Sequence, residues 1–264
     1  MLILYRPIDG LDSTEEDAAK KYFKVVRQRT KIHPWELVIG RYSVLPFYVE
    51  LEKDICNQGS WLINTYQQHR FVADIRNWVP LLEEFTPKTW ERLEDLPEVG
   101  PFVLKGETNS RKDRWNTHMY AETKRDAVEV ALRLQEDALI STQKIIVRKY
   151  EPLVQLMTGL NGLPVTKEFR FFICDRQILS GGFYWSSFVD DLTVIPSPKE
   201  VPDDWLSKVI EIIGDNIRFY ALDVAQKTDG SWMVVELNDG QMSGLSENDP
   251  DVLYRNLMNV LTKI

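Results

Sequence analysis

Two apolar runs near the C-terminal end, joined by a short polar turn, constrain the fold of this chain most strongly. The first run ends at Asp223 and the second at Glu236-Leu237-Asn238. Residues two apart on a strand face the same side, so Glu236 and Asn238 point together, and a hairpin brings Asp223 beside them. Two carboxylates and an amide oxygen suit a hard divalent cation such as Mg²⁺, with substrate phosphates completing the shell. The pattern indicates nucleotide handling; ordinary turn residues and a solvated glutamate are the alternative.

Composition excludes several classes of protein. The chain has 264 residues, 44% hydrophobic and 11% aromatic, which allows one large or two modest globular domains. Its net charge of −8 and pI near 5.1 argue against general nucleic-acid binding but leave room for a local basic pocket. The two cysteines, Cys56 and Cys174, are far apart and predict neither a metal site nor a disulfide framework, as expected in a reducing compartment.

The apolar runs are too short for targeting or membrane segments. The N-terminal run, Leu2 to Tyr5, lacks the long apolar core of a signal peptide. No stretch approaches the roughly 18 apolar residues of a membrane-spanning helix. We therefore expect a soluble, cytoplasmic protein that binds neither membrane nor nucleic acid.

The first part of the chain, to about residue 95, has the pattern of a small α/β unit. Apolar runs predict strands at 2–5, 36–40 and 61–64, and helical spacing predicts helices at 14–28, 44–55 and 65–79. Strands that alternate with helices predict a parallel sheet. Prolines and glycines then punctuate residues 85–101, so we expect a boundary between structural units near residue 97.

A lysine at a strand end is followed by a polar loop. The short apolar run 101–104 ends at Lys105, and residues 106–114 then supply hydroxyls, amides and three cations. Such a loop closes over phosphates in many proteins, with the lysine as a point charge. A solvated charged loop between two strands is the alternative, and the Walker spacing is absent.

Two further segments place charged residues on strands. Residues 144–149 predict a strand that runs into a proline-stopped linker, and residues 167–185 predict a hairpin. In that hairpin Glu168, Arg170 and Phe172 share one face. On a solvent-exposed face the first two form a weak ion pair; on an inward face they could contact ribose hydroxyls and a γ-phosphate.

The histidines form no catalytic set. They are scattered at His33, His69 and His118, and each is interpreted first as structural or as a surface residue. His69 lies in a predicted helix beside Tyr66 and could contact a substrate, but the structural interpretation is favoured. Glycines at 181–182 and 240–244 could shape a substrate pocket, with Asp239 and Ser243 as secondary candidates; ordinary turns explain them equally well.

The order of these pieces resembles the ATP-grasp superfamily over roughly residues 70–250. Within it the chain is most similar to the clade named for two arginines and a lysine. It is more distantly similar to the cell-division-cycle assembly-chaperone family, through residues 148–152 and 168–172. The resemblance implies an α/β (α+β) fold with two α+β lobes gripping ATP. It implies a small pre-ATP-grasp-like domain at 1–96 and an ATP-grasp domain at 97–264, with a lid lobe at 97–150 and a metal-binding lobe at 151–264.

The resemblance also implies roles for the nucleotide-binding residues. Lys105 would hold the α- and β-phosphates, with catalytic as well as binding importance, and residues 106–114 would form the lid. The adenine linker would be Lys149, Tyr150 and Glu151, which recognises the base largely through backbone groups, and Arg148 precedes it among the nucleotide-binding residues.

The remaining site residues are implied in the same way. Glu168 would take the ribose or act as an outer ligand, and Arg170 would face the γ-phosphate as a catalytic residue. Asp223, Glu236 and Asn238 would bind one or two Mg²⁺ ions. One position departs from the family pattern: where another lysine is usual, Arg76 follows Asp74, and an arginine replaces the charge but not the shape.

The implied activity is that of an ATP-dependent carboxylate–amine ligase. ATP would phosphorylate a carboxylate to an acylphosphate, and an amine would attack it with release of ADP and phosphate. The substrates would be small molecules or peptides. The alternative is an ATP-binding assembly chaperone that acts on a protein partner, and the absence of an obvious partner-binding extension in the sequence favours the enzyme.

Overall fold

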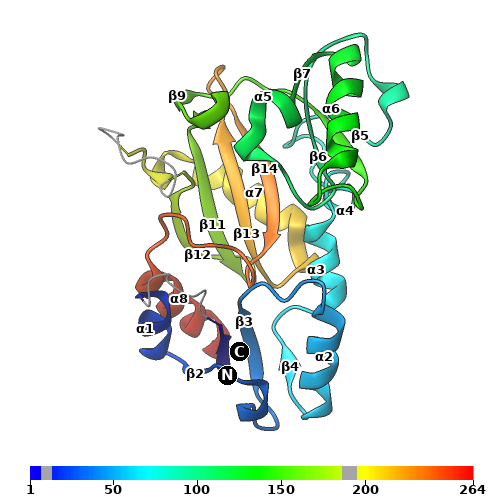
Figure 1. The fold of residues 1–264 in the computed structure, drawn as a ribbon. Helices are drawn as coiled ribbons and strands as arrows, with labels where there is room; N and C mark the ends of the chain where they lie inside the picture. The colour runs from blue at the N-terminus through cyan, green and yellow to red at the C-terminus, as the bar shows by residue number, and fades with distance from the viewer. Residues whose placement is uncertain (7–13, 186–194, 264) are drawn as a thin grey trace.

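The structure is a computed structural model that describes residues 1–6, 14–185 and 195–263. Its described strands form three four-stranded sheets and one two-stranded hairpin, arranged around a central antiparallel sheet (Figure 1). None of the described helices is long and apolar enough to cross a membrane.

The N-terminal sheet is parallel, as the alternating pattern predicts. Its strands have the order β2-β1-β3-β4 and the bounds β1 Leu2–Tyr5, β2 Lys24–Val26, β3 Leu37–Arg41 and β4 Trp61–Leu62. The helices of this part are α1 Thr14–Lys20, α2 Tyr48–Asn57, α3 Tyr66–Ala73 and α4 Ile75–Trp78. The strands are buried because apolar clusters cover both faces of the sheet.

Two predicted helices are shorter than expected. The helix predicted at 14–28 ends at Lys20, because the β-branched pair Val25 and Val26 forms a strand that pairs with β1. The helix predicted at 65–79 is broken at Asp74, whose side chain accepts a hydrogen bond from the Arg76 amide and caps α4.

The second sheet is antiparallel and carries the lysine strand. Its order is β5-β8-β6-β7, with bounds β5 Thr89–Trp90, β6 Val99–Gly106, β7 Tyr120–Thr123 and β8 Ile145–Lys149. Two helices accompany it, α5 Trp115–His118 and α6 Lys124–Glu136. The buried side chains of α6 pack against this sheet in a separate apolar cluster. The predicted boundary near residue 97 stays a proposal; β5 precedes that residue and pairs with β8.

The central sheet contains both predicted hairpins. Its order is β12-β11-β13-β14, with bounds β11 Glu168–Cys174, β12 Gln177–Phe183, β13 Phe219–Gln226 and β14 Trp232–Asp239. The other elements of this region are the hairpin β9 Gln155–Thr158 and β10 Pro164–Thr166, and the helices α7 Asp203–Ile213 and α8 Pro250–Thr262.

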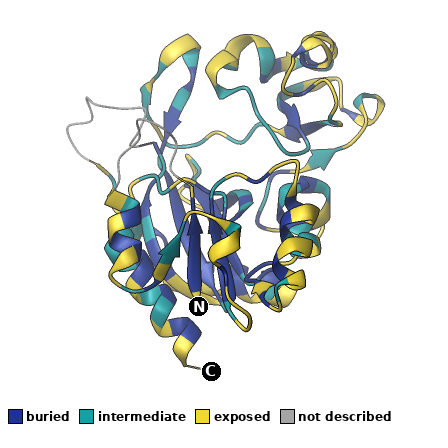
Figure 2. Cartoon of the chain, turned by 60° about the horizontal axis from the view of Figure 1, so that its bottom comes forward, coloured by how far each residue is buried: buried dark blue, intermediate teal, exposed yellow. Residues whose placement is uncertain are grey.

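The two faces of the central sheet have different neighbours. Phe169 and Phe171 point to the face that the apolar side of α7 covers, while Phe172 points to the opposite face, toward α8 and the N-terminal sheet. Figure 2 shows buried residues concentrated in the strands and exposed residues on the outer sides of the helices. On the face of the central sheet that carries Phe172, the end around Glu168 and Arg170 is charged. This end belongs to the candidate active site.

Candidate active site

Charged residues form a row across three strands of the central sheet. Arg170 on β11 lies opposite Asp223 on β13, and Asp223 lies opposite Glu236 on β14. The Arg170 guanidinium donates from Nε and Nη2 to the two Asp223 oxygens at 2.8 and 2.7 Å. Its Nη1 donates to the Gly244 carbonyl at 2.9 Å. Asp223 is fully buried, so this bidentate pair fixes Arg170 in the sheet.

Lys105 connects this row to the second sheet. It lies on β6, and its ammonium forms an ion pair with Glu236 across the gap between the sheets. Burial would raise the pKa of Glu236, but Lys105 and Lys112 lower it to about 2. Glu236 is therefore ionised at neutral pH and available as an acceptor or ligand.

Glu168 has the opposite electrostatic character. It is buried at the start of β11, and Oε1 has no hydrogen-bond partner among the described residues. Burial raises the pKa of Glu168 to about 7, although Lys112 opposes the shift; Asp223 and Glu236 add to it. Two carboxyl groups in one site thus have pKa values on opposite sides of the ordinary value, which is typical of functional sites.

Lys112 is the residue that sequence reasoning did not single out. It belongs to the predicted lid loop, and its Nζ donates to the Tyr184 hydroxyl at 2.8 Å. The ammonium lies 4.2 Å from the centre of the Tyr184 ring and 4.9 Å from that of Trp185. Burial would lower the pKa of Lys112, but Tyr184, Glu168 and Glu236 raise it. The only sequence signal was three cations in one loop, which does not indicate which of them turns inward.

A cavity of about 130 Å³ lies between the second sheet and the central sheet. We call it the apolar cavity; its lining includes Val103, Met119, Leu163, Trp185 and Met233, together with Lys105, Lys112, Arg148, Glu168 and Glu236. The segment Lys149, Tyr150 and Glu151 forms part of its wall, and its role as an adenine linker stays a prediction. The Lys149 ammonium contacts Glu151 Oε1 at 2.8 Å, so these two side chains pair with one another.

Arg148 is a buried cation with neutral partners in this cavity. It donates to the Val235 carbonyl at 2.7 Å and to Thr86 Oγ1 at 2.5 Å, while its Nε has no partner among the described residues. Burial lowers the pKa of Arg148 to about 10, and Glu236 opposes this only in part. An anionic ligand in the apolar cavity would supply the charge that Arg148 lacks.

A larger cavity, about 370 Å³, lies on the other side of Lys105 and Glu236. We call it the polar cavity; its lining includes Ser43, His69, Thr108, Asn109, Arg170, Asn238, Asp239 and Ser243. Lys105, Ser110 and Glu236 border both cavities. The two cavities therefore meet at the ion pair between the sheets, and the larger one leaves more room for a second ligand.

The predicted metal ligands lie together. Asn238 Nδ2 approaches Asp223 Oδ2 at 3.5 Å, and Glu236 lies opposite Asp223. Within residues 1–6, 14–185 and 195–263, no cluster of three or more His, Cys, Asp or Glu side chains is arranged to hold a metal. Both Asp223 oxygens contact Arg170, and one Glu236 oxygen contacts Lys105. Two carboxylates and an amide fit Mg²⁺ when phosphate oxygens complete the shell.

Arg76 does not share in this assembly. Its guanidinium donates to Asp74 at 2.8 and 2.6 Å and to Glu107 at 2.7 Å. Arg76 is not one of the described residues that line the apolar or the polar cavity. That Arg76 takes the place of the lysine usual in the family therefore stays a prediction. Asp239 and Ser243, the secondary candidates, both line the polar cavity.

A lysine on the second sheet thus faces a row of charged residues on the central sheet. The family model for an ATP-grasp domain of the clade named for two arginines and a lysine, family 3, matches residues 92–257, and the chain belongs to that family. The predicted superfamily, clade and mixed α/β fold are thereby confirmed. A search of curated proteins finds no match to the chain.

Solved structures agree with this fold at low sequence identity. D-cycloserine synthetase DcsG has a TM-score of 0.60 and 15% identity, covering 94% of this chain and 93% of that chain. The ATP-grasp ligase PsnB, complexed with precursor peptide PsnA2 and AMPPNP, has a TM-score of 0.60 and 12% identity over 100% and 98%. The macrocyclase MdnC from Microcystis aeruginosa MRC, bound with precursor peptide MdnA, has a TM-score of 0.60 and 9% identity over 100% and 99%.

The more distant resemblance is also found. Cdc123 from Schizosaccharomyces pombe is similar over 67% of this chain and 87% of that chain, at 16% identity. Its TM-score is 0.45, and no functional argument is based on it.

Proposed function

We propose that this protein is an ATP-dependent carboxylate–amine ligase that works through an acylphosphate. The observation that carries the proposal is that the apolar and polar cavities meet at Lys105 and Glu236. An adenine base fits the apolar walls, and its phosphates would extend toward Lys105, Lys112 and Arg148. The transferred phosphoryl group would then reach the polar cavity, where Arg170 is held.

The side chains supply positioning and charge neutralisation in this scheme. Lys105, Lys112 and Arg148 would neutralise the phosphates, while Arg170 would face the phosphoryl group as it moves to a substrate carboxylate. Asp223, Glu236 and Asn238 would hold Mg²⁺, which supplies a further positive charge on the phosphate oxygens. Glu168, two residues before Arg170 on β11, would take the ribose.

The substrates named for the structurally similar proteins support a small-molecule or peptide substrate. One is a synthetase named for D-cycloserine, and two are complexed with precursor peptides. The polar cavity has residues for a carboxylate at Arg170 and Lys105, which is the group that the acylphosphate step requires.

The first test is the thermal stability of the protein with ATP, with and without Mg²⁺. Stabilisation by ATP and Mg²⁺ is expected for the wild type and should be lost in Glu236→Gln, which removes the ionised ligand. Glu211→Gln, on the exposed side of α7, is the matched control and should behave as the wild type does. No stabilisation of the wild type at millimolar ATP would contradict the proposal.

A second test measures the proposed ligation reaction directly. Incubation with ATP, Mg²⁺ and a panel of amino acids and short peptides, with hydroxylamine as the nucleophile, should release ADP and form a hydroxamate from the acylphosphate. ADP release without any hydroxamate would point to hydrolysis of ATP and not to ligation.

A further inference from the structure

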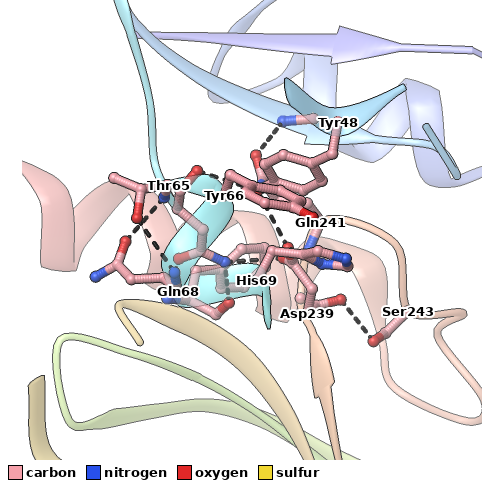
Figure 3. A network of polar contacts seen from close by, with 12 residues as sticks. Tyr48, Thr65, Tyr66, Gln68, His69, Asp239, Gln241 and Ser243 are labelled. Carbon is pink, nitrogen blue, oxygen red and sulfur yellow. Dashed lines mark hydrogen bonds and ion pairs between the residues drawn. The ribbon is translucent and has the colours of Figure 1, made fainter. Parts of the chain in front are cut away.

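A histidine on the wall of the polar cavity is backed by a carboxylate. His69 lies on α3, is buried, and lines that cavity together with Lys105, Arg170 and Glu236. Its Nδ1 contacts Asp239 Oδ2 at 3.2 Å, at the end of β14 (Figure 3). α3 and β14 pack against one another, so this contact joins the N-terminal part of the chain to the strand that carries Glu236 and Asn238.

The hydrogen bonds of Asp239 determine which ring nitrogen carries the proton. Its Oδ1 accepts from Asn64 Nδ2 at 2.8 Å and from the Gln241 amide at 2.9 Å. Its Oδ2 lies 3.2 Å from the Tyr48 hydroxyl, whose single proton can be donated either to this oxygen or to the Asn64 carbonyl at 3.0 Å. These contacts use Asp239 as a hydrogen-bond acceptor, and Nδ1 of His69 is assigned as a further donor to its Oδ2. Nε2 then has a free lone pair.

The ring is held in a fixed plane. It stacks on Tyr48 with ring centres 4.5 Å apart and an interplanar angle of 19°. The Tyr48 hydroxyl also accepts from Gln241 Nε2 at 2.7 Å, and Gln241 Oε1 accepts from the Gly40 amide at 3.0 Å. No hydrogen bond of Nε2 occurs within the described residues. The acceptor nitrogen of a rigid imidazole thus has no hydrogen-bond partner among the described residues, and the ring lines the polar cavity.

We propose that Nε2 of His69 accepts the proton of the attacking amine, an inference that rests on the proposed ligase function. The amine nitrogen forms a bond to the acyl carbon, and the bond from that carbon to the phosphate oxygen breaks. The electron pair leaves on the phosphate, and the proton lost by nitrogen passes to Nε2. Asp239 stabilises the imidazolium that forms, as a carboxylate does behind a histidine base.

A purely structural role explains these contacts less well. Asp239 already accepts two hydrogen bonds on Oδ1, from the Asn64 side chain and the Gln241 backbone N–H, so holding this carboxylate in place does not require His69. The ring lines a cavity shared with Lys105 and Glu236, and its second nitrogen makes no hydrogen bond among the described residues, so this nitrogen is suited to contact a ligand atom.

The matched variant for this proposal is His69→Asn. The asparagine amide can replace Nδ1 as the donor to Asp239, while the Nε2 position is removed. His33→Asn is the control, because His33 is exposed and outside both cavities. The melting temperature of each variant is measured first, so that a folding defect is recognised.

The experiment compares two nucleophiles in the same ligation assay, with ATP, Mg²⁺ and a panel of amino acids as carboxylate donors. The two nucleophiles are hydroxylamine and amino-acid amides, and each loses one proton from nitrogen when it is acylated. Hydroxylamine is the more reactive and attacks acylphosphates rapidly without a catalytic base, whereas the amine of an amino-acid amide depends more strongly on a base that accepts this proton. The ratio of amide to hydroxamate product should fall about 100-fold in His69→Asn. It should not change in His33→Asn.

Other outcomes would overturn the inference. An unchanged ratio in His69→Asn, or an equal loss of both products, would show that His69 does not serve the amine step. Hydroxamate without any amide from the wild type would exclude amines of this class. No hydroxamate from the wild type would instead defeat the proposed function, and the inference with it.

A second measurement needs no variant. In ¹⁵N-histidine-labelled wild-type protein, long-range ¹H–¹⁵N spectra distinguish a protonated from an unprotonated ring nitrogen. The spectrum of His69 should show a proton on Nδ1 and none on Nε2. A proton on Nε2 in the neutral ring would overturn the proposal independently of the ligation assay.

Discussion

The apolar and polar cavities balance their charges in different ways. In the apolar cavity Arg148 is buried against a carbonyl and a hydroxyl and has no carboxylate partner among the described residues. In the polar cavity Arg170 is fully matched by Asp223, and Asp239 contacts the His69 ring. The difference teaches that the first cavity is prepared for an anionic ligand, whereas a ligand in the second must compete with ion pairs already formed. Lys105 and Glu236 stand between them and serve both.

Breaking the matched pair should have the largest effect. Asp223→Asn leaves Arg170 buried without a counter-charge and should lower the free energy of unfolding by about 3–5 kcal/mol. Asp175→Asn is the control, because Arg218 contacts Asp175 in the same bidentate manner at 2.8 and 3.0 Å but near the surface. It should cost at most about 1 kcal/mol. Urea denaturation of both variants measures this, and equal losses would contradict the role of burial.

Removing the cation between the cavities should affect function more than stability. Lys105→Met should lower kcat/KM for ADP release by about 100-fold, because a buried positive charge is lost where phosphate charge develops. Lys144→Met, one residue before β8 and exposed, should stay within about twofold of the wild type. Similar rates for the two variants would mean that the cavities do not communicate through Lys105.

The raised pKa of Glu168 predicts a pH-dependent stability. The folded state binds this proton more tightly than the unfolded state, so the stabilisation is complete below pH 4.5 and is lost as pH rises through about 7. Glu168→Gln retains the neutral form and should be more stable than the wild type by about 3 kcal/mol at pH 8. At pH 4 the two should agree. Urea denaturation of the nucleotide-free protein at both values checks the sign, and a constant difference would contradict it.

The unmatched arginine should have the smallest of these effects, and on ligand binding alone. Arg148→Met should weaken ATP binding about tenfold, because one charge-assisted contact to an anion is lost. Lys149→Met should change the Kd less than twofold, since the Lys149 side chain pairs with Glu151 and the linker is expected to act through its backbone. Calorimetric titration with AMPPNP measures both. A larger effect of Lys149→Met would reverse the assignment of the two residues.

Much of the candidate site follows from local patterns. Asp223 and Glu236 lie opposite one another because they belong to the two strands of one hairpin. Its turn residues and the alternation of its side chains can be recognised in one continuous stretch of sequence. Lys105 at a strand end and the shared face of Glu168 and Arg170 follow from the period of two in a strand. Contacts between distant segments were not visible in the same way. Lys112 required the loop to turn inward against Tyr184, 72 residues away.

Local reasoning failed where tertiary pairing overrode helical spacing. Charged residues after Lys20 favoured a longer helix, but Val25 and Val26 gain a parallel partner in β1 once the sheet assembles. The contact of His69 with Asp239 joins residues 170 apart in the chain, and nothing in the helix of His69 indicates it. The sequence by itself determined the strands, their faces and the charged residues upon them, because strand alternation is set by adjacent residues. Only the tertiary structure decided which charges are matched, which are left for a ligand, and where the two cavities meet, because these depend on which distant strands and loops are brought together.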